Sequence, residues 1–303
     1  MAVYEQTYKR YAGPLTPEWS RFLIIPRHAY RGVFSSKLFT AFYVICFLPL
    51  LVEAILIYLH HNANALGILQ LNVRELVPID ASFFQTFVNI QGGFAFFVAL
   101  LVGPPLVSRD LRNNALPLYL CRPFSRAEYV LGKMSVLLIL LSAMTWVPQL
   151  LMFLFQSYLE GAVWFKDNLW MASAIFIGSV VWILLLALLS QTISALVKWR
   201  VVASAVMLGI FFIPSVFAEF VNLVFQTRWG HLFSLGALIG NISAGLFGTF
   251  VQATSLRIEI DDAIREVVVT EPPLWCAWTV LFLVCVACLA ILAARVKAYE
   301  VVR

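Results

Sequence analysis

The sequence predicts an all-α integral membrane protein with six transmembrane helices, and three features support this prediction. The 303-residue chain is 62% hydrophobic and only 12% charged, whereas soluble domains carry about 25% charged residues. Six segments stay apolar over about 20 residues, the length that crosses a bilayer as a helix. Lys and Arg gather in alternate connecting segments, as they do in multi-pass membrane proteins.

The chain divides into a tail, one membrane domain and a second tail. Residues 1–37 and 295–303 form the polar ends, and residues 38–294 form the membrane domain. We expect no cleavable signal peptide, because residues 1–37 lack the apolar core that such peptides require. The predicted spans are 38–59, 83–107, 130–155, 169–197, 201–225 and 274–294.

An amphipathic helix is predicted ahead of the first span, over residues 16–36. Thr16 suits the N-cap and Pro17 the first helical position, and Pro26 should kink the helix. Aromatic side chains such as Trp19 lie beside basic ones such as Arg21, a pattern typical of helices in the membrane interface. An ordinary juxtamembrane anchor would share this pattern.

The basic residues predict the topology. Of the 21 Lys and Arg residues, all fall on one side of the predicted membrane except Arg74, Lys166, Arg228, Arg257 and Arg265. Because Lys and Arg mark the cytoplasmic side, both termini and the segment 108–133 are expected in the cytoplasm.

Residues 229–250 are apolar and rich in glycine, and they are nearly long enough to span. A seventh span would place the basic C-terminal end outside, against the charge distribution. We therefore predict a re-entrant or interfacial helical hairpin within the outer loop 226–273. Close helix packing around Gly236 and Gly240 explains the glycines equally well.

No disulfide framework or metal site is expected from the cysteines. Four of the five lie in predicted spans, and the pair Cys285 and Cys288 has no second pair of ligands nearby. Packing between helices accounts for them.

The cytoplasmic segment 108–133 carries the most specific pattern in the chain. Its residues from Arg109 to Leu120 can form a short helix along the membrane surface, and Pro117 should distort the end of that helix. Ser125 and Glu128 have the spacing of a capping box, which should begin the third span just after Pro123. A basic loop beside anionic lipid would also explain the charges.

This segment resembles the signature loop of ABC-2 type permeases, the membrane subunits of ATP-binding-cassette exporters. The resemblance rests on Ser108-Arg109-Asp110, the leucines from Leu116 to Leu120, Pro123, Ser125-Arg126, Glu128 and Gly132-Lys133. The six-span layout, the basic N-terminal helix and the basic C-terminal tail are similar to that family as well. Asn114-Ala115 and Pro117 depart from the family's usual pattern.

The resemblance implies a coupling helix that docks on a cytoplasmic ATPase subunit, in a plasma membrane such as the bacterial inner membrane. It also implies pairing with a second copy or a sister permease. The residues expected to make the coupling contact are Arg109, Asp110, Arg112, Leu116, Leu120, Arg122, Pro123, Ser125, Arg126 and Glu128.

The chain itself is not expected to be an enzyme or to hold a cofactor. It contains no G-x-x-x-x-G-K-[ST] phosphate loop, since Met134 follows Lys133. ATP and Mg²⁺ are therefore expected on the partner ATPase. We expect contacts with membrane lipid and none with nucleic acid.

Polar residues inside the spans are candidates for a translocation path, because such residues are rare in membranes. The candidates are Glu53, Asn89, Gln91, Gln149 and Glu219. A structural carboxylate, paired locally or facing water, is an equally good explanation for Glu53 and a better one for Glu219.

Two other functions are compatible with the sequence. A membrane scaffold or sensor would use the same loop to bind a cytoplasmic partner. An ion-coupled secondary transporter should have inverted repeats and helices broken in mid-membrane, and neither is evident in the sequence. The sequence does not name the transported substrate.

Overall fold

The computed structural model describes residues 24–62, 78–113, 126–197, 199–260 and 263–295. Six of its helical segments are long and apolar enough to cross a membrane, which confirms the predicted number. They are Lys37–His61, Ala81–Ser108, Ala127–Glu160, Leu169–Leu196, Arg200–Phe225 and Leu274–Arg295. Each span begins and ends within about five residues of its predicted bounds.

Three of the six segments are interrupted. The first consists of α2 (Lys37–Ile45) and α3 (Leu48–His61), the second of α5 (Ala81–Val102) and α6 (Pro104–Arg112), and the third of α8 (Arg126–Met144) and α9 (Trp146–Glu160). Proline follows each break, at Pro49, Pro104 and Pro148. Proline lacks the N–H that continues a helix, and its ring clashes with the carbonyl four residues earlier. The sequence shows no clear sign of helices broken within the membrane, so these breaks correct the expectation of continuous spans.

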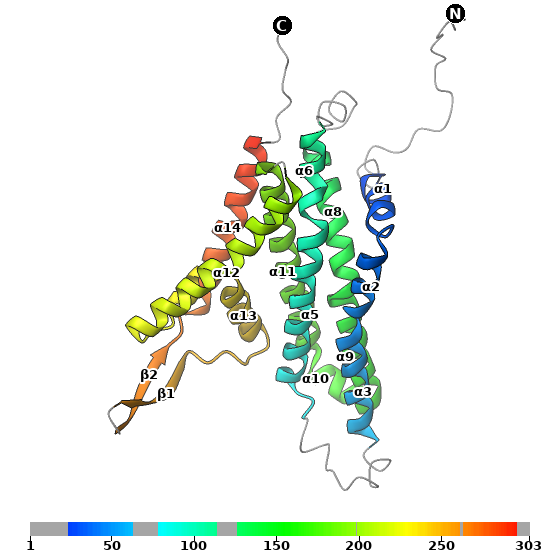
Figure 1. The fold of residues 1–303 in the computed structure, drawn as a ribbon. Helices are drawn as coiled ribbons and strands as arrows, with labels where there is room; N and C mark the ends of the chain where they lie inside the picture. Colours follow the sequence, from blue (N-terminus) through cyan, green and yellow to red (C-terminus); the bar gives the residue numbers. More distant parts are fainter. Residues whose placement is uncertain (1–23, 63–77, 114–125, 198, 261–262, 296–303) are drawn as a thin grey trace, which may run out of the picture.

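The remaining spans are continuous, and α11 lies at the centre of the bundle. The helix α11 (Leu169–Leu196) packs against α5, α6, α8, α9, α12, α13 and α14. Both α12 (Arg200–Phe225) and α14 (Leu274–Arg295) lie to one side of it, and α12 leans away from the other spans (Figure 1). Two further helices flank the spans: α1 (Ile24–Val33) packs on α8, and α10 (Ala162–Asp167) follows α9.

The bundle has two unlike ends. The end of α6 and the starts of α1, α8 and α12 lie at one end, which we call the basic end because it carries Arg27, Arg31, Arg112, Lys133 and Arg200 (Figure 1). The opposite end carries α10 and the segment that joins α12 to α14 (Figure 1). Of the helix predicted over residues 16–36, the structure describes α1, in which Pro26 lies in the first turn and not at a kink; residues 16–23 lie outside the described residues. The position of this helix in the membrane interface stays a prediction.

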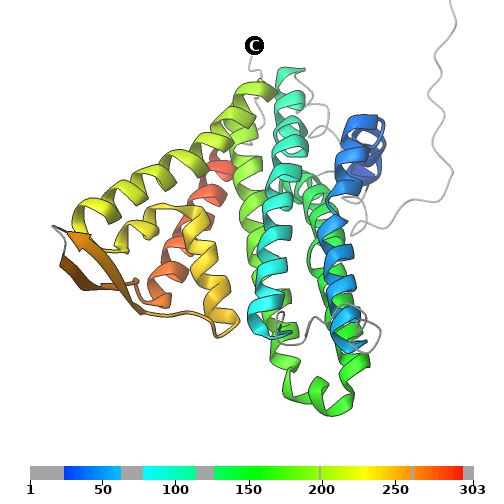
Figure 2. The ribbon, with the colours of Figure 1, turned by 60° about the horizontal axis from the view of Figure 1, so that its bottom comes forward.

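The segment between α12 and α14 contains a short 3₁₀ helix, η3 (Trp229–Phe233), and the helix α13 (Leu235–Leu246). At 12 residues α13 is too short to span, and it packs against α11, α12 and α14. An antiparallel hairpin follows, in which β1 (Ala253–Ile260) pairs with β2 (Ala263–Thr270), from Ala253 opposite Thr270 to Ile260 opposite Ala263 (Figure 2). The all-α prediction missed this hairpin, although β-branched residues dominate β2, as is typical of strands.

Candidate functional site

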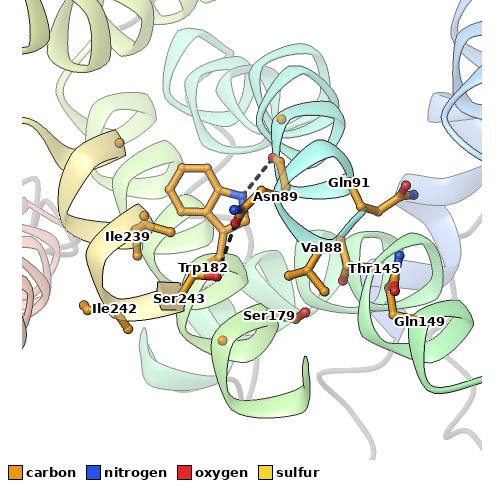
Figure 3. Close-up of a pocket in the computed structure, with 15 residues that line it drawn as sticks. Val88, Asn89, Gln91, Thr145, Gln149, Ser179, Trp182, Ile239, Ile242 and Ser243 are labelled. Atoms are coloured by element: carbon orange, nitrogen blue, oxygen red, sulfur yellow. Dashed lines mark hydrogen bonds between the residues drawn. The ribbon is translucent and has the colours of Figure 1, made fainter. Parts of the chain in front are cut away.

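A cavity of about 200 Å³ lies inside the bundle, between α5, the break of the third span, α11 and α13 (Figure 3). Three of the five predicted path residues line it, which are Asn89, Gln91 and Gln149. The remaining lining combines apolar and glycine positions with Thr145, Ser179, Trp182 and Ser243. The structure thus brings most of the predicted path together in one place.

The side chain of Gln91 joins two of the helix breaks. Its Nε2 donates to the backbone carbonyl of Cys46, at the break of the first span, and to that of Met144, at the break of the third. In a continuous helix the carbonyl of Met144 would accept from the N–H of residue 148, but that residue is proline. Gln91 therefore donates to the carbonyl of Met144, which has no donor within the third span. The Gln91 side chain is only 1% exposed.

Glu53 lies behind the cavity and reaches it through Gln149. The Nε2 of Gln149 donates to Oε2 of Glu53 over 3.0 Å. Both side chains are buried: Gln149 is 1% exposed and Glu53 0%. Glu53 Oε1 and Gln149 Oε1 have no hydrogen-bond partner. A buried polar atom without a partner costs free energy, because it has lost its hydrogen bonds to water.

Contacts between α5, α11 and α13 close the other wall of the cavity. Ser243 donates to Oδ1 of Asn89 over 3.3 Å, and the indole Nε1 of Trp182 donates to the carbonyl of Gly92 over 2.8 Å (Figure 3). Sequence analysis missed Trp182 and Ser243, because neither side chain is unusual in an apolar span.

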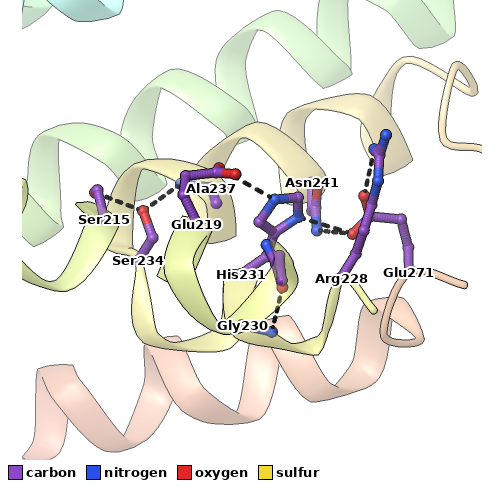
Figure 4. A network of polar contacts seen from close by, with 10 residues as sticks. Ser215, Glu219, Arg228, Gly230, His231, Ser234, Ala237, Asn241 and Glu271 are labelled. Atoms are coloured by element: carbon purple, nitrogen blue, oxygen red, sulfur yellow. Dashed lines mark hydrogen bonds and ion pairs between the residues drawn. The ribbon is translucent and has the colours of Figure 1, made fainter. Parts of the chain in front are cut away.

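Glu219 does not belong to this cavity, so its prediction as a path residue is not supported by its position. Its side chain is 74% exposed, and its Oε1 lies 3.6 Å from Nε2 of His231. His231 in turn contacts the buried Glu271 through Nδ1, and Arg228 pairs with the same carboxylate over 2.9 Å (Figure 4). This network joins α12, η3 and the start of α14 at the opposite end of the bundle.

The predicted coupling residues fall partly outside the described chain. Leu116, Leu120, Arg122, Pro123 and Ser125 lie outside it, while Arg109, Asp110 and Arg112 lie in α6 and Arg126 and Glu128 lie in the first turn of α8. The helix that carries Arg109 begins at Pro104, in continuation of the second span, so a separate surface helix does not start at Arg109 as predicted. The start of α8 at Arg126 agrees with the position expected from the capping box.

Three residues join the two ends of this loop, and we call them the loop-base clamp: Asp110, Tyr129 and Lys133. Lys133 Nζ lies 2.8 Å from Oδ2 of Asp110, and the Tyr129 hydroxyl donates to the same oxygen over 2.8 Å. Lys133 is 8% exposed and Tyr129 1% exposed. The clamp therefore connects the end of α6 firmly to the first turns of α8.

A second, more open cavity of about 640 Å³ lies beside the clamp at the basic end. It separates α1 from α5, α6 and α12, and Asp110, Lys133, His28 and Arg200 lie on its wall. Next to it, the Tyr30 hydroxyl of α1 donates to the carbonyl of Val136 in α8 over 3.0 Å. Burial raises the pKa of Tyr30 to about 12, so the phenol keeps its proton and the bond is present at any physiological pH.

Replacing Gln91 by Met should destabilise the protein while keeping its volume nearly unchanged. The substitution leaves the carbonyls of Cys46 and Met144 without a donor, and each unpaired buried polar group costs about 1–3 kcal/mol. We expect a loss of about 2–4 kcal/mol, measured as a lower midpoint of thermal unfolding in detergent. Gln85→Met, whose Oε1 accepts a single bond from Thr249, is the control and should lose much less. Equal losses would show that the bridge between the breaks is unimportant.

Among the described residues, no three His, Cys, Asp or Glu side chains gather in a way that could hold a metal ion. A comparison with curated proteins found no significant match. A family model described as ABC-2 family transporter protein matches residues 31–294. Because this match covers nearly the whole chain and includes the six apolar helices, the chain belongs to the ABC-2 family and is a membrane permease.

Proposed function

We propose that this permease is the membrane subunit of an ATP-driven exporter in the plasma membrane, with its basic end in the cytoplasm. A separate ATPase binds ATP and Mg²⁺, and a second copy of the chain or a sister permease completes the transporter. The observation that carries this proposal is the loop-base clamp, because it turns the basic loop into a lever attached to two spans.

The lever leads directly to the cavity. Lys133 lies near the start of α8, and the last residue of the same helix, Met144, is bonded to Gln91. A helix is stiff over this distance of roughly 17 Å. A displacement of the loop is therefore transmitted along α8 to Met144. There the Gln91 amide joins the first, second and third spans beside the cavity. Rigid movement of helices is a common way to switch a binding site.

The polar path through the membrane then consists of Asn89, Gln91 and Gln149, with Glu53 behind them. These side chains lie in one cluster around the cavity, which supports a role in substrate passage. Glu219 is left out of the path because it lies in the network of His231 and Glu271.

Reversing the charge of Arg112 or Arg126 tests the coupling. With Arg112→Glu or Arg126→Glu, we expect the copurified ATPase to bind at least about tenfold more weakly, which corresponds to about 1.4 kcal/mol, and ATP hydrolysis to lose its dependence on the permease. Arg112 is exposed at the end of α6 and free to meet a partner's acidic surface. Binding and hydrolysis are measured on the complex in nanodiscs.

Lys166→Glu, an exposed substitution on α10 at the opposite end, is the control and should leave both quantities unchanged. A purified chain that associates with no ATPase, or whose ATPase ignores both arginine variants, would contradict the proposal.

The broken spans favour a second candidate, an ion-coupled transporter, because such proteins bind ions at helices interrupted in mid-membrane. Transport by the permease reconstituted in sealed lipid vesicles distinguishes the two functions. Transport that requires ATP and a partner supports the exporter, while uptake or release driven by an ion gradient without ATP supports the second candidate.

A further inference from the structure

The open cavity at the basic end lies at the level where three spans end. Its wall includes Leu38 beside the start of the first span, Leu106 near the end of the second, and Arg200 at the start of the fifth. A transmembrane helix leaves the hydrocarbon of the bilayer near its ends. The three spans therefore place this cavity at the boundary between acyl chains and headgroups, whichever end faces the cytoplasm.

Much of the cavity wall is apolar. The helices α2, α5 and α6 contribute Leu38, Phe39, Leu101, Val102 and Leu106. Leu38 is 86% exposed, and Gly32 of α1 leaves open space, since a Cβ there would meet nothing within 4 Å. Contact between water and apolar surface is unfavourable. At the edge of a bilayer, an acyl chain is therefore the neighbour that suits this wall.

The same wall offers hydrogen-bond donors that the protein does not use. Arg200 and His28 form no ion pair with an acidic side chain in the described part of the chain. Ser36 Oγ accepts a bond from the N–H of Phe39 over 3.4 Å, and its own proton remains available. Such groups suit a ligand that carries acceptor oxygens.

The charges at this end favour an anion. Asp110 is the one carboxylate among the described lining residues, and Lys133 lies 2.8 Å from it, so the charge of Arg200 is left unbalanced. Outside the cavity, α1 adds the exposed Arg27 and Arg31. Clusters of Lys and Arg beside a membrane attract anionic lipid headgroups.

The size of the cavity suits part of a lipid. Its volume of about 640 Å³ lies within the range of about 300–1,000 Å³ that is usual for ligand sites. A soluble anion would leave the apolar wall uncovered, whereas a phospholipid brings a charged group and a hydrocarbon chain together. The opening at the membrane boundary lets the rest of the lipid remain in the bilayer.

We propose that this cavity binds an anionic phospholipid, with its phosphate beside Arg200 and the Ser36 hydroxyl and an acyl chain along the apolar wall. The bound lipid joins α1 to α12, which the cavity separates, next to the loop-base clamp. This site goes beyond the proposed function, because it shares no residue with the cavity of the polar path and does not depend on a partner ATPase.

The test titrates the full chain in a neutral detergent with dioctanoyl phosphatidylglycerol, dioctanoyl phosphatidylcholine and glycerol phosphate. The first is an anionic lipid, the second has no net charge, and the third is an anion without acyl chains. A saturable rise in the midpoint of thermal unfolding gives the apparent affinity. We expect phosphatidylglycerol to bind at least about fivefold more tightly than phosphatidylcholine, the gain typical of one cation near an anionic lipid. Glycerol phosphate should not bind.

Two variants test the charge and the space separately. Arg200→Gln should abolish the preference for phosphatidylglycerol, while Arg31→Gln, which removes an exposed charge outside the cavity, is the control and should keep it. Gly32→Leu fills the cavity from α1 without changing a charge, and it should abolish saturable binding of both lipids. Gly93→Leu, in α5 and also facing open space but outside this cavity, is its control and should leave binding unchanged.

Several results would overturn the assignment: no saturable binding, equal affinity for the two lipids, a preference that survives Arg200→Gln, or binding that survives Gly32→Leu. Binding of glycerol phosphate as tight as that of phosphatidylglycerol would do the same. A chain that binds lipid only after residues 1–23 are removed, or only after a dimer dissociates, would assign the cavity to the tail or to a second copy. None of these measurements involves the ATPase, so their failure leaves the proposed function standing.

Discussion

Replacing Lys133 by Met is expected to cost about 3 kcal/mol of stability and to uncouple the loop from the spans. The substitution leaves Asp110 in a largely buried position without its cation, and an uncompensated buried charge is strongly destabilising. For a protein of this size the loss should lower the midpoint of thermal unfolding by about 5 °C. ATP hydrolysis by the complex should lose its dependence on the permease as well.

A double variant separates stability from coupling. Asp110→Asn combined with Lys133→Met removes the lone charge and keeps an acceptor for the Tyr129 hydroxyl, so thermal stability should largely return. The charged link between α6 and α8 stays broken, and coupling should remain impaired. Lys166→Met, at an exposed site, is the control for the loss of a lysine. If Lys133→Met and Lys166→Met unfold at the same temperature, the clamp does not stabilise the protein.

Replacing Gly103 by Ala should be at least as damaging, although it adds a single methyl group. A Cβ at residue 103 would overlap Oγ of Ser190 and lie 2.7 Å from both Cβ of Ser190 and the carbonyl oxygen of Ala99. Overpacking of this kind costs about 1–3 kcal/mol, and here backbone atoms form part of the wall. We expect the upper end of that range or complete loss of folded protein, measured as the monodisperse fraction after gentle heating in detergent.

The contact with Ser190 offers a way to rescue this variant. Ser190→Gly removes both side-chain atoms that the new methyl group would strike, so Gly103→Ala with Ser190→Gly should be more stable than Gly103→Ala alone. Gly93→Ala, within α5 and facing open space, is the control and should behave like the unaltered protein. A stable Gly103→Ala protein would show that α5 and α11 are not in close contact at this point.

The number and approximate bounds of the spans were predictable because they depend on composition over long stretches. A run of about 20 apolar residues has few alternatives to a transmembrane helix, whatever its neighbours are. The resemblance to ABC-2 permeases was also readable from the sequence, and the family match over residues 31–294 confirms it. The β1–β2 hairpin was not predicted, because two strands of eight residues give a much weaker sequence signal than an apolar run of about 20 residues.

The candidate site was predictable only in part. Asn89, Gln91 and Gln149 stand out in the sequence because polar side chains in spans are rare. Their roles cannot be read from the sequence. The Gln91 amide, for example, donates to the carbonyls of Cys46 and Met144, which are separated from it by 45 and 53 residues along the chain. Glu219 looked similar to Glu53 in the sequence, yet one is exposed beside His231 and the other is fully buried.

By itself the sequence determined that the chain lies in a membrane, how many times it crosses it and where the charges gather, because these properties follow from local hydrophobicity and charge. Only the tertiary structure decided which polar atoms find partners inside the bundle. That outcome depends on the distances between separate helices: it brings the Gln91 amide to the carbonyls of Cys46 and Met144 and joins Lys133 to Asp110.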